Sequence, residues 1–214
     1  MAEQAYTEHR YGHHGGTTRV KPARTGGTEK YRSTRSAMGD KMRYAITRFS
    51  GEENTAHCSD GTETTDHCAA YQHVSDAAQR IADTSKRGAA YIYDTTLSPG
   101  GQFTDEQAAQ LVDAYRADLE ARGVRVEGMT YVVHQNTRNT HIHMLYATQK
   151  TVQHGDNRGN KRSMAQEADK LRTPEQAREW QAAQERAAEQ TAQRQAARST
   201  RSSQDDHDTR SRGR

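Results

Sequence analysis

The sequence predicts an α+β fold: a central antiparallel sheet that carries a histidine motif, with helices packed on it, a polar C-terminal helix and disordered ends. The first indication is the order of the strongest segments, in which an apolar strand at 90–97 and an amphipathic helix at 104–123 precede two strands joined by a short loop. The second is that apolar residues concentrate between Ala89 and Thr148. Strands joined by a short loop pair antiparallel, and we expect the helices to cover one face of the sheet.

The segments upstream of this core are more weakly patterned. Residues 1–35 are rich in Gly, Thr, Arg and His, and they predict a polar basic arm with one short strand at 17–21. A helix is predicted at 34–49, because its apolar residues recur at the spacing of one helical face. Those apolar residues are Met38, Met42, Ala45, Ile46 and Phe49. Residues 50–70 predict a loop, and residues 71–82 predict a short helix.

The strand at 90–97 is rich in strand-forming residues, and a turn at 98–101 follows it. The helix after this turn is the best defined in the chain. Thr104 and Gln107 form a capping box at its start, and Gly123 is placed to end it in the left-handed conformation. Its apolar stripe consists of Ala108, Leu111, Val112, Tyr115 and Leu119.

Three histidines mark the two strands that follow. His141 and His143 flank one apolar residue, so on a strand both imidazoles point to the same face. His134 ends another apolar run, and the polar loop 135–140 is expected to fold that run back as a hairpin. Three imidazoles then converge, which is the number of protein ligands that a catalytic metal site uses while it keeps a position open for substrate.

Imidazole ligands suit Zn, Ni, Co or Mn better than Mg. No cysteine lies near the histidine strands to complete a structural zinc site, which favours a functional metal site there. The pairs His57-Cys58 and His67-Cys68 form a second cluster, but they lack the usual zinc-motif spacing. These pairs leave open one further interpretation of the chain, in which it is a zinc-stabilised interaction protein.

Outside the core the chain is too polar to bury much surface. The hydrophobic fraction is 31%, against roughly 45–50% (with Gly counted) in average globular domains. Residues 149–163 predict a polar loop and 164–198 a helix with almost no apolar face. We divide the chain into the arm 1–35, a core domain 36–163, a helical extension 164–198 and a disordered tail 199–214.

The net charge is +3, and the basic residues gather in the first fifty positions, as in arms that contact phosphates. No stretch approaches the roughly 18 apolar residues of a membrane-spanning helix. Residues 1–30 lack the apolar centre of a secretory signal, and the two cysteines give no disulfide framework. We therefore expect a cytoplasmic protein without a membrane span.

The histidine motif resembles the third motif of plasmid mobilisation relaxases, which belong to the histidine-hydrophobic-histidine class of single-strand endonucleases. The run 43–48 resembles the first motif of that family, which holds a nucleophilic tyrosine. Thr84 and Ser85 lie where the second motif places a serine that contacts DNA. The resemblance covers roughly residues 36–150, with the motifs in the family's order.

This resemblance implies a relaxase that nicks one DNA strand at a plasmid transfer origin, with Tyr44 as nucleophile and a 5′-phosphotyrosyl intermediate. It implies a divalent ion, Mg or Mn in the cell, held by His134, His141 and His143. The expected partners are single-stranded or supercoiled origin DNA and accessory mobilisation proteins. The side chains expected to contact DNA are Ser85, Arg43, Arg48, Arg138, Lys161 and Arg162.

Two alternatives remain open from the sequence. Tyr31 rivals Tyr44 as the nucleophile. The family commonly has Asp where this chain has Asn136, which favours a truncated or accessory module that binds metal and DNA without cutting. Asp94 and Asn136 are also the predicted hydrogen-bond partners that orient the metal-binding imidazoles.

Overall fold

The computed structural model describes residues 12–20, 32–47, 54–85, 89–135, 138–150 and 154–211. For 12–20, 32–37, 154–162 and 198–211 it describes the backbone alone. The chain consists of two compact units, Met1–Leu171 and Arg172–Arg214.

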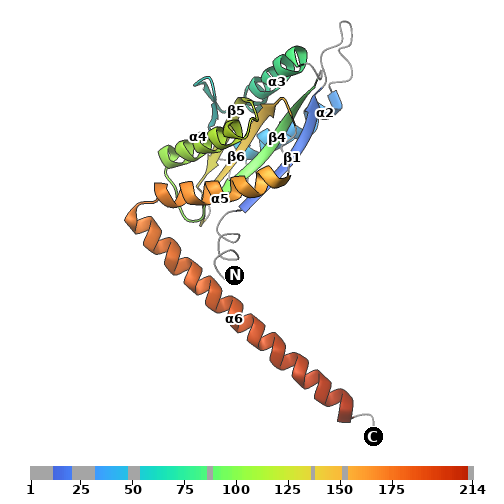
Figure 1. The fold of residues 1–214 in the computed structure, drawn as a ribbon, viewed down its shortest axis with the longest axis vertical. Coiled ribbons are helices and arrows are strands. Elements are labelled where there is room, and N and C mark those ends of the chain that lie inside the picture. The colour runs from blue at the N-terminus through green and yellow to red at the C-terminus, as the bar shows by residue number, and fades with distance from the viewer. Residues whose placement is uncertain are drawn as a thin grey trace. The chain divides into compact units, whose positions relative to one another are not determined.

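The first unit is built on a six-stranded sheet with the order β1-β4-β6-β5-β2-β3 (Figure 1). Its strands are β1 (Gly12–Val20), β2 (Ala56–Cys58), β3 (Glu63–Thr64), β4 (Ala90–Ser98), β5 (Val126–His134) and β6 (His141–Thr148). Every neighbouring pair is antiparallel, which confirms the predicted sheet and α+β class. The two histidine strands, β5 and β6, lie in the middle of the sheet, and β4 pairs with β6.

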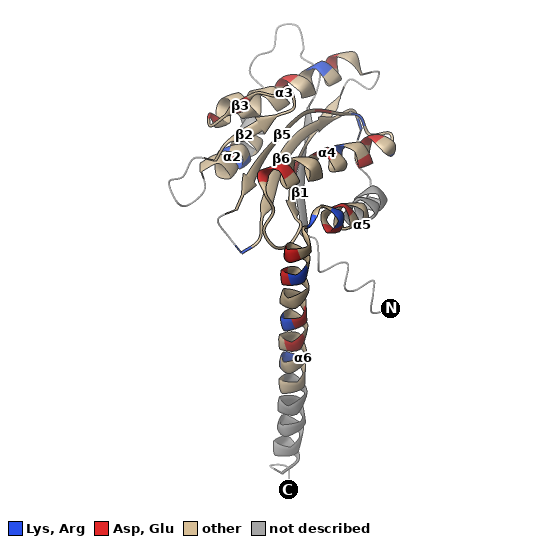
Figure 2. Cartoon of the chain, turned by 90° about the vertical axis from the view of Figure 1, so that its left-hand side faces the viewer, with Lys and Arg blue, Asp and Glu red and all other residues tan. Residues whose placement is uncertain are grey.

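Helices cover both faces of this sheet, so the prediction of one covered face is wrong. The helices are α2 (Arg32–Thr47), α3 (His67–Thr84), α4 (Asp105–Ala121) and α5 (His154–Leu171). Figure 2 shows α2 and α3 on one side of the sheet and α4 and α5 on the other. The cause lies in the central strands, whose side chains are apolar in both directions and need a cover on each side. In β6, for example, the neighbours Met144 and Leu145 point to opposite faces and are both buried.

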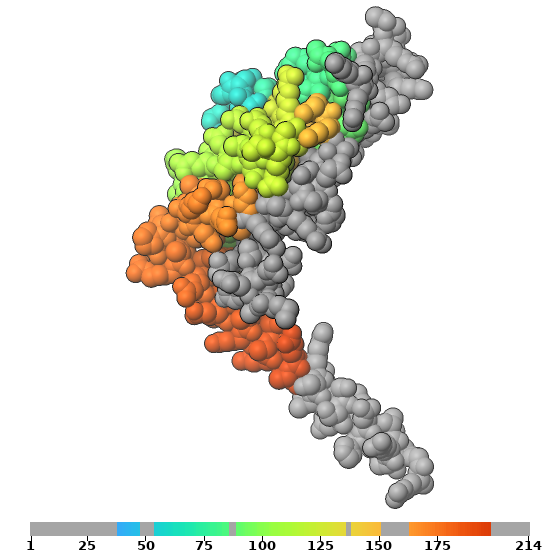
Figure 3. Space-filling view, viewed as in Figure 1, coloured from blue at the N-terminus to red at the C-terminus, as the bar shows by residue number. Residues whose placement is uncertain are grey.

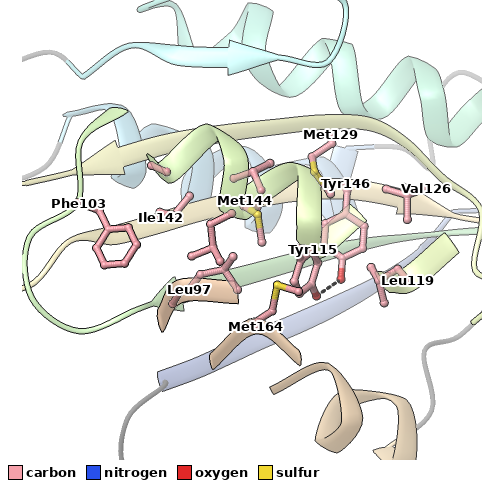
Figure 4. Packing of buried hydrophobic residues seen from close by; sticks show 14 of the residues in the cluster. Leu97, Phe103, Tyr115, Leu119, Val126, Met129, Ile142, Met144, Tyr146 and Met164 are labelled. Carbon is pink, nitrogen blue, oxygen red and sulfur yellow. Dashed lines mark hydrogen bonds between the residues drawn. The ribbon is translucent and has the colours of Figure 1, made fainter. Parts of the chain in front are cut away.

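Two apolar clusters fill the spaces between the layers. The cluster under α4 and α5 includes Tyr115 and Met164 and takes Ile142, Met144 and Tyr146 from β6 (Figure 4). The other cluster, under α2 and α3, includes Met42, Ile46, Val74, Leu145 and Ala147. Because side chains alternate along a strand, the two histidines of β6 share the face of Leu145 and Ala147. The histidine motif therefore lies on the α2 side of the sheet.

The helix predicted at 104–123 is confirmed in detail. Thr104 accepts a hydrogen bond from the Gln107 amide, and the Gln107 side chain accepts one from the Thr104 amide, which completes the capping box. Gly123 follows the helix with φ of 71°, as expected for the left-handed end. The whole predicted stripe is buried: Ala108, Leu111, Val112, Tyr115 and Leu119.

The helix predicted at 34–49 is also present, as α2, with Met38, Met42, Ala45 and Ile46 buried. Phe49 lies outside the described residues. The helix predicted at 71–82 is longer and starts at His67, because Asp66 caps it by accepting a hydrogen bond from the Cys68 amide.

Other segments differ from the prediction. The loop expected at 50–70 contains the β2–β3 hairpin, which extends the sheet beyond β5. The strand expected at 17–21 runs from Gly12 to Val20 and pairs with β4 along its whole length. The loop expected at 149–163 is largely the start of α5, whose later part packs beside α4 (Figure 3).

The second unit consists mainly of α6 (Pro174–Ser211). At its start, Thr173 and Gln176 exchange hydrogen bonds in a capping box, with Pro174 at the first helical position. The helix continues from the predicted extension 164–198 into the segment 199–214. Over the part of the chain that the structure describes, no helix combines the length and apolar character needed to cross a membrane.

Candidate functional site

The β5–β6 hairpin brings the three predicted histidines to one face. His134 lies directly opposite His141, and Val132 lies opposite His143. Residues that face each other across an antiparallel pair project from the same side, about 4.5–5.5 Å apart at Cβ. All three imidazoles therefore start from one surface, the one that α2 covers.

The loop end of this hairpin is held by the turn between β4 and α4. The Gln135 side chain donates through Nε2 to the Phe103 carbonyl oxygen at 2.9 Å and to the Asp105 carboxylate at 3.0 Å. The Thr140 amide donates to the Gly101 carbonyl oxygen at 2.9 Å, and its hydroxyl accepts from the Phe103 amide at 2.9 Å. These bonds fix the ends of β5 and β6 beside the end of β4.

Two hydroxyl groups of β4 meet the β6 histidines. The Thr96 hydroxyl lies 3.2 Å from Nδ1 of His143, and the Ser98 hydroxyl lies 2.5 Å from Nδ1 of His141. When Nδ1–H donates to a hydroxyl oxygen, Nε2 is the nitrogen that holds the lone pair. A partner on Nδ1 is the usual support of a histidine that ligates a metal through Nε2.

His134 makes a different contact. Its side chain is buried, with 1% of its surface exposed, and Nε2 donates a hydrogen bond to the backbone oxygen of Ala45 in α2. A carbonyl oxygen only accepts, so in the neutral ring the lone pair is on Nδ1. The ring centroids of His134 and His143 are 4.7 Å apart.

Tyr44, the predicted nucleophile, lies beside these rings. Its ring centroid is 6.2 Å from that of His143, with the two planes at 81°. Tyr44 is also 45% exposed, although Ala45, the next residue in α2, is buried. The phenol is thus open to solvent on the face of the sheet that bears the histidines.

Other tyrosines are less suited to attack a phosphate. Tyr115 and Tyr146 are buried on the opposite face, where their hydroxyls hydrogen-bond to each other at 2.8 Å (Figure 4). Burial raises the pKa of Tyr115 and raises that of Tyr146 well above its usual value. Burial also raises the pKa of Tyr131, which is half-buried on that same face. Tyr31 lies outside the described residues.

The three histidines have the donor chemistry of a divalent-metal site, with three imidazoles on one face. Their donor atoms are not gathered as closely as those of two other groups. Among the described residues, Cys58–Asp60–His73 and Asp66–His67–Cys68 are the groups whose donor atoms all lie within 4.8 Å of one another.

The predicted DNA contacts are distributed over different parts of the fold. Arg43 is exposed beside Tyr44 and forms a 3.4 Å ion pair with Asp40, and Arg138 is exposed in the hairpin loop. Ser85 ends α3 before the start of β4, whereas the histidines pair with the end of β4, roughly 20 Å along the strand. The structure therefore does not bring Ser85 to the histidines.

Three predicted basic residues have no described side chains. Arg48 lies outside the described residues. Lys161 and Arg162 belong to α5, whose Met164 and Ala165 pack on the face of the sheet opposite the histidines.

The predicted orienting partners of the imidazoles also differ. Asp94 forms an ion pair with Lys41 of α2, and Thr96 and Ser98 take the positions beside the imidazoles. Asn136 lies outside the described residues. The positions of the two hydroxyls could have been predicted from the sequence. Asp94, Thr96 and Ser98 are spaced two residues apart in one strand, so their side chains lie on the same face.

The two His-Cys pairs do not form a shared site. His57 is stacked on Tyr131, with ring centroids 4.9 Å apart, and its Nδ1 lies 3.0 Å from the Glu63 carboxylate. Cys58 lies instead with Asp60 and His73, a pairing that the sequence reasoning missed.

Comparisons of the chain with protein-family models, with curated proteins and with solved structures found no match. The likeness to relaxases is thus a resemblance of motifs within roughly residues 36–150.

Proposed function

We propose that this protein is a metal-dependent DNA strand transferase of the relaxase type, which nicks one strand at a plasmid transfer origin through Tyr44. The observation that supports it most is the position of an exposed tyrosine beside paired histidines. The Tyr44 ring lies 6.2 Å from His143, which lies 4.7 Å from His134. A nucleophile next to candidate metal ligands is an arrangement that suits metal-assisted transesterification of a phosphodiester.

The chemistry assigned to Tyr44 is transesterification. Its hydroxyl oxygen attacks the phosphorus atom, a new tyrosine–phosphate bond forms, and the bond from phosphorus to the 3′ oxygen breaks. The phenol proton leaves to solvent, which reaches the exposed side chain, and the departing 3′ oxygen takes up a proton. Attack by that 3′ hydroxyl on the phosphotyrosine reverses the reaction and reseals the strand.

The histidines would hold the ion through Nδ1 of His134 and Nε2 of His141 and His143. A bound divalent ion, Mg or Mn, would act as a Lewis acid on the phosphate oxygens. The Thr96 and Ser98 hydroxyls keep two of the rings oriented, and the Ala45 carbonyl orients the third. The protein residues thus fix the nitrogen that each ring presents.

DNA is expected to approach over the exposed end of α2 and the hairpin loop. Arg43 and Arg138 lie on these two segments and would neutralise backbone phosphates on either side of Tyr44. Accessory mobilisation proteins are proposed as further partners, from the motif resemblance alone.

A second function, an accessory module that binds metal and DNA without cutting, is favoured by one observation. Among the described residues, the three histidines do not form one of the groups whose donor atoms all lie within 4.8 Å of one another. Such a module would bind the metal ion and the DNA without forming a covalent bond between Tyr44 and the DNA.

The test uses labelled single-stranded oligonucleotides that tile the DNA flanking the reading frame. We expect the full chain with Mn²⁺ to form a complex that survives denaturation by detergent, and EDTA or His143→Ala to abolish it. Arg116→Ala, on α4 at the other face, serves as the matched control and keeps the adduct. Binding of Mn²⁺ and DNA with neither adduct nor nick would establish the accessory module instead.

A further inference from the structure

A second group of metal-ligating side chains lies where the β2–β3 hairpin meets α3. The donor atoms of Cys58, Asp60 and His73 all lie within 4.8 Å of one another. A thiolate, a carboxylate oxygen and an imidazole nitrogen are the three ligand types that zinc takes in proteins. The three residues come from two separate elements, so the group is a product of the tertiary fold.

The hairpin turn holds two of these ligands in place. The Cys58 amide donates to the Thr62 carbonyl oxygen at 2.8 Å, which closes the turn. Within it, Oδ1 of Asp60 accepts from the Thr62 amide at 2.9 Å, and Oδ2 lies 3.4 Å from Nδ1 of His73. One carboxylate oxygen thus rigidifies the turn while the other is directed at the imidazole.

A bulged segment of β5 positions both halves of the group. The Ser59 amide donates to the Met129 carbonyl oxygen at 2.8 Å, which ties the hairpin turn to β5. Next to it, Gly128 has φ of 61°, and a Cβ there would lie 2.5 Å from the Ala77 Cβ and 3.1 Å from the His73 carbonyl oxygen. Glycine is therefore needed for α3 to approach closely enough to bring His73 over the turn.

The environment suits an ion with one position open to solvent. Cys58 is buried at 8% exposure, whereas the side chains of His73 and Asp60 are 19% and 52% exposed. The Ser59 hydroxyl lies 3.0 Å from Nε2 of His73, so either ring nitrogen can bind while the other keeps an oxygen partner.

We propose that Cys58, Asp60 and His73 bind a zinc-type divalent cation through one sulfur, one oxygen and one nitrogen, with water as the fourth ligand. Binding converts the Cys58 thiol to a thiolate and releases its proton to solvent. The ion joins the β2–β3 hairpin to α3 and so stabilises the edge of the sheet beyond β5.

The other close group has no comparable arrangement. Asp66, His67 and Cys68 are consecutive residues at the start of α3, and Asp66 already caps the helix through the Cys68 amide at 2.8 Å. They lack a ligand from a second element. Cys68 is exposed and serves as the matched control for Cys58.

The proposed cation site is separate from the histidine site of the hairpin. Cys58 pairs with Thr130, and His134 lies four residues further along β5, roughly 13 Å away. The two sites share no ligand. The proposal of this cation site can therefore be tested independently of the proposed nicking activity.

Cobalt(II) titration of the full chain tests the proposal, because a thiolate ligand gives a sulfur-to-cobalt charge-transfer band that imidazole ligands do not give. We expect the band in the wild type and in Cys68→Ser, and its loss in Cys58→Ser. Asp60→Asn, at an exposed side chain, should weaken cobalt binding about tenfold or more. Circular dichroism of each variant checks that the fold is kept.

A second readout does not depend on a cysteine substitution. Bound Zn²⁺ should slow alkylation of Cys58 in the wild type and leave alkylation of Cys68 unchanged, as measured by peptide mass spectrometry. A band that persists in Cys58→Ser, a band lost in Cys68→Ser alone, or no zinc protection of Cys58 would overturn the assignment.

Discussion

His134 Nε2 donates a hydrogen bond to the carbonyl oxygen of Ala45, the residue that follows Tyr44. Ala45 lies in the last turn of α2, where carbonyl oxygens have no partner within the helix. Its neighbour Ile46 is satisfied in the same way by Asn54, whose amide and side chain donate to the Ile46 oxygen at 2.9 and 3.2 Å. One candidate metal ligand thus also fixes the helix end that presents the tyrosine.

This double function predicts a large stability effect for His134→Ala. The substitution leaves a buried carbonyl oxygen without its donor, which costs about 1–3 kcal/mol, and removes a fully buried ring besides. We expect the urea midpoint of unfolding to fall clearly. His141→Ala removes a half-buried ring and should cost less than about 1 kcal/mol. Equal losses in the two variants would mean that the bond to Ala45 contributes little.

Thr96→Val tests the support of His143. It removes the hydroxyl that lies 3.2 Å from Nδ1 and keeps the side-chain shape. Loss of such a partner typically weakens metal affinity 10–100-fold, and we expect about this loss for Mn²⁺ by calorimetry, with little change in fold. Thr95→Val, at the neighbouring position on the opposite face, should leave the affinity unchanged. An unaltered affinity in Thr96→Val would show that the Thr96 hydroxyl does not support His143 as a metal ligand.

Arg138→Ala and Arg43→Ala test the proposed DNA path. On single-stranded DNA, each arginine that neutralises one phosphate contributes about 0.7 to the slope of the salt dependence of binding, so each variant should lower that slope by about 0.7. Fluorescence anisotropy with labelled single-stranded DNA at several salt concentrations measures it. Arg116→Ala on α4 is the control, and a slope that falls equally in this variant would place the DNA elsewhere.

The Tyr115–Tyr146 pair predicts how stability depends on alkaline pH. Burial raises the pKa of both hydroxyls in the folded state above the ordinary value near 10, so the folded protein holds protons that the unfolded chain releases. Their contribution is intact below pH about 10 and is lost as pH rises further. Tyr146→Phe should lose stability less steeply than the wild type in urea unfolding above that pH. The same steepness in both proteins would contradict this cause.

Local signals in the sequence predicted the central elements. The capping box at Thr104 and the alternation of polar and apolar residues around His141 each involve residues that are close together in the sequence. The helix and the strand that these patterns predict are confirmed as α4 and β6. The β2 and β3 strands are too short to show alternation, so their segment resembled a loop. In α5 the early Gly and Asn residues obscured the helix, although Met164, Ala165, Ala168 and Leu171 fall on one helical face.

Contacts between distant residues could not be read from the sequence. His134 and Ala45 are 89 positions apart, and no local pattern shows that a helix end needs a donor from a strand. The same holds for Cys58 and His73, since their meeting depends on how closely Gly128 lets α3 approach β5. The residue types in the sequence could therefore suggest the histidines as metal ligands. The position of Tyr44 beside them is set by the packing of α2 and could not be predicted from the sequence.

The central claim is that Tyr44 is the nucleophile. Its most direct test is to digest the covalent complex formed with single-stranded DNA and Mn²⁺ and to locate the nucleotide-bearing peptide by mass spectrometry. We predict a phosphotyrosyl bond at Tyr44, and a Tyr44→Phe variant that still binds DNA but forms no adduct. An adduct at Tyr31 or any other residue, or one that persists in Tyr44→Phe, would contradict the assignment.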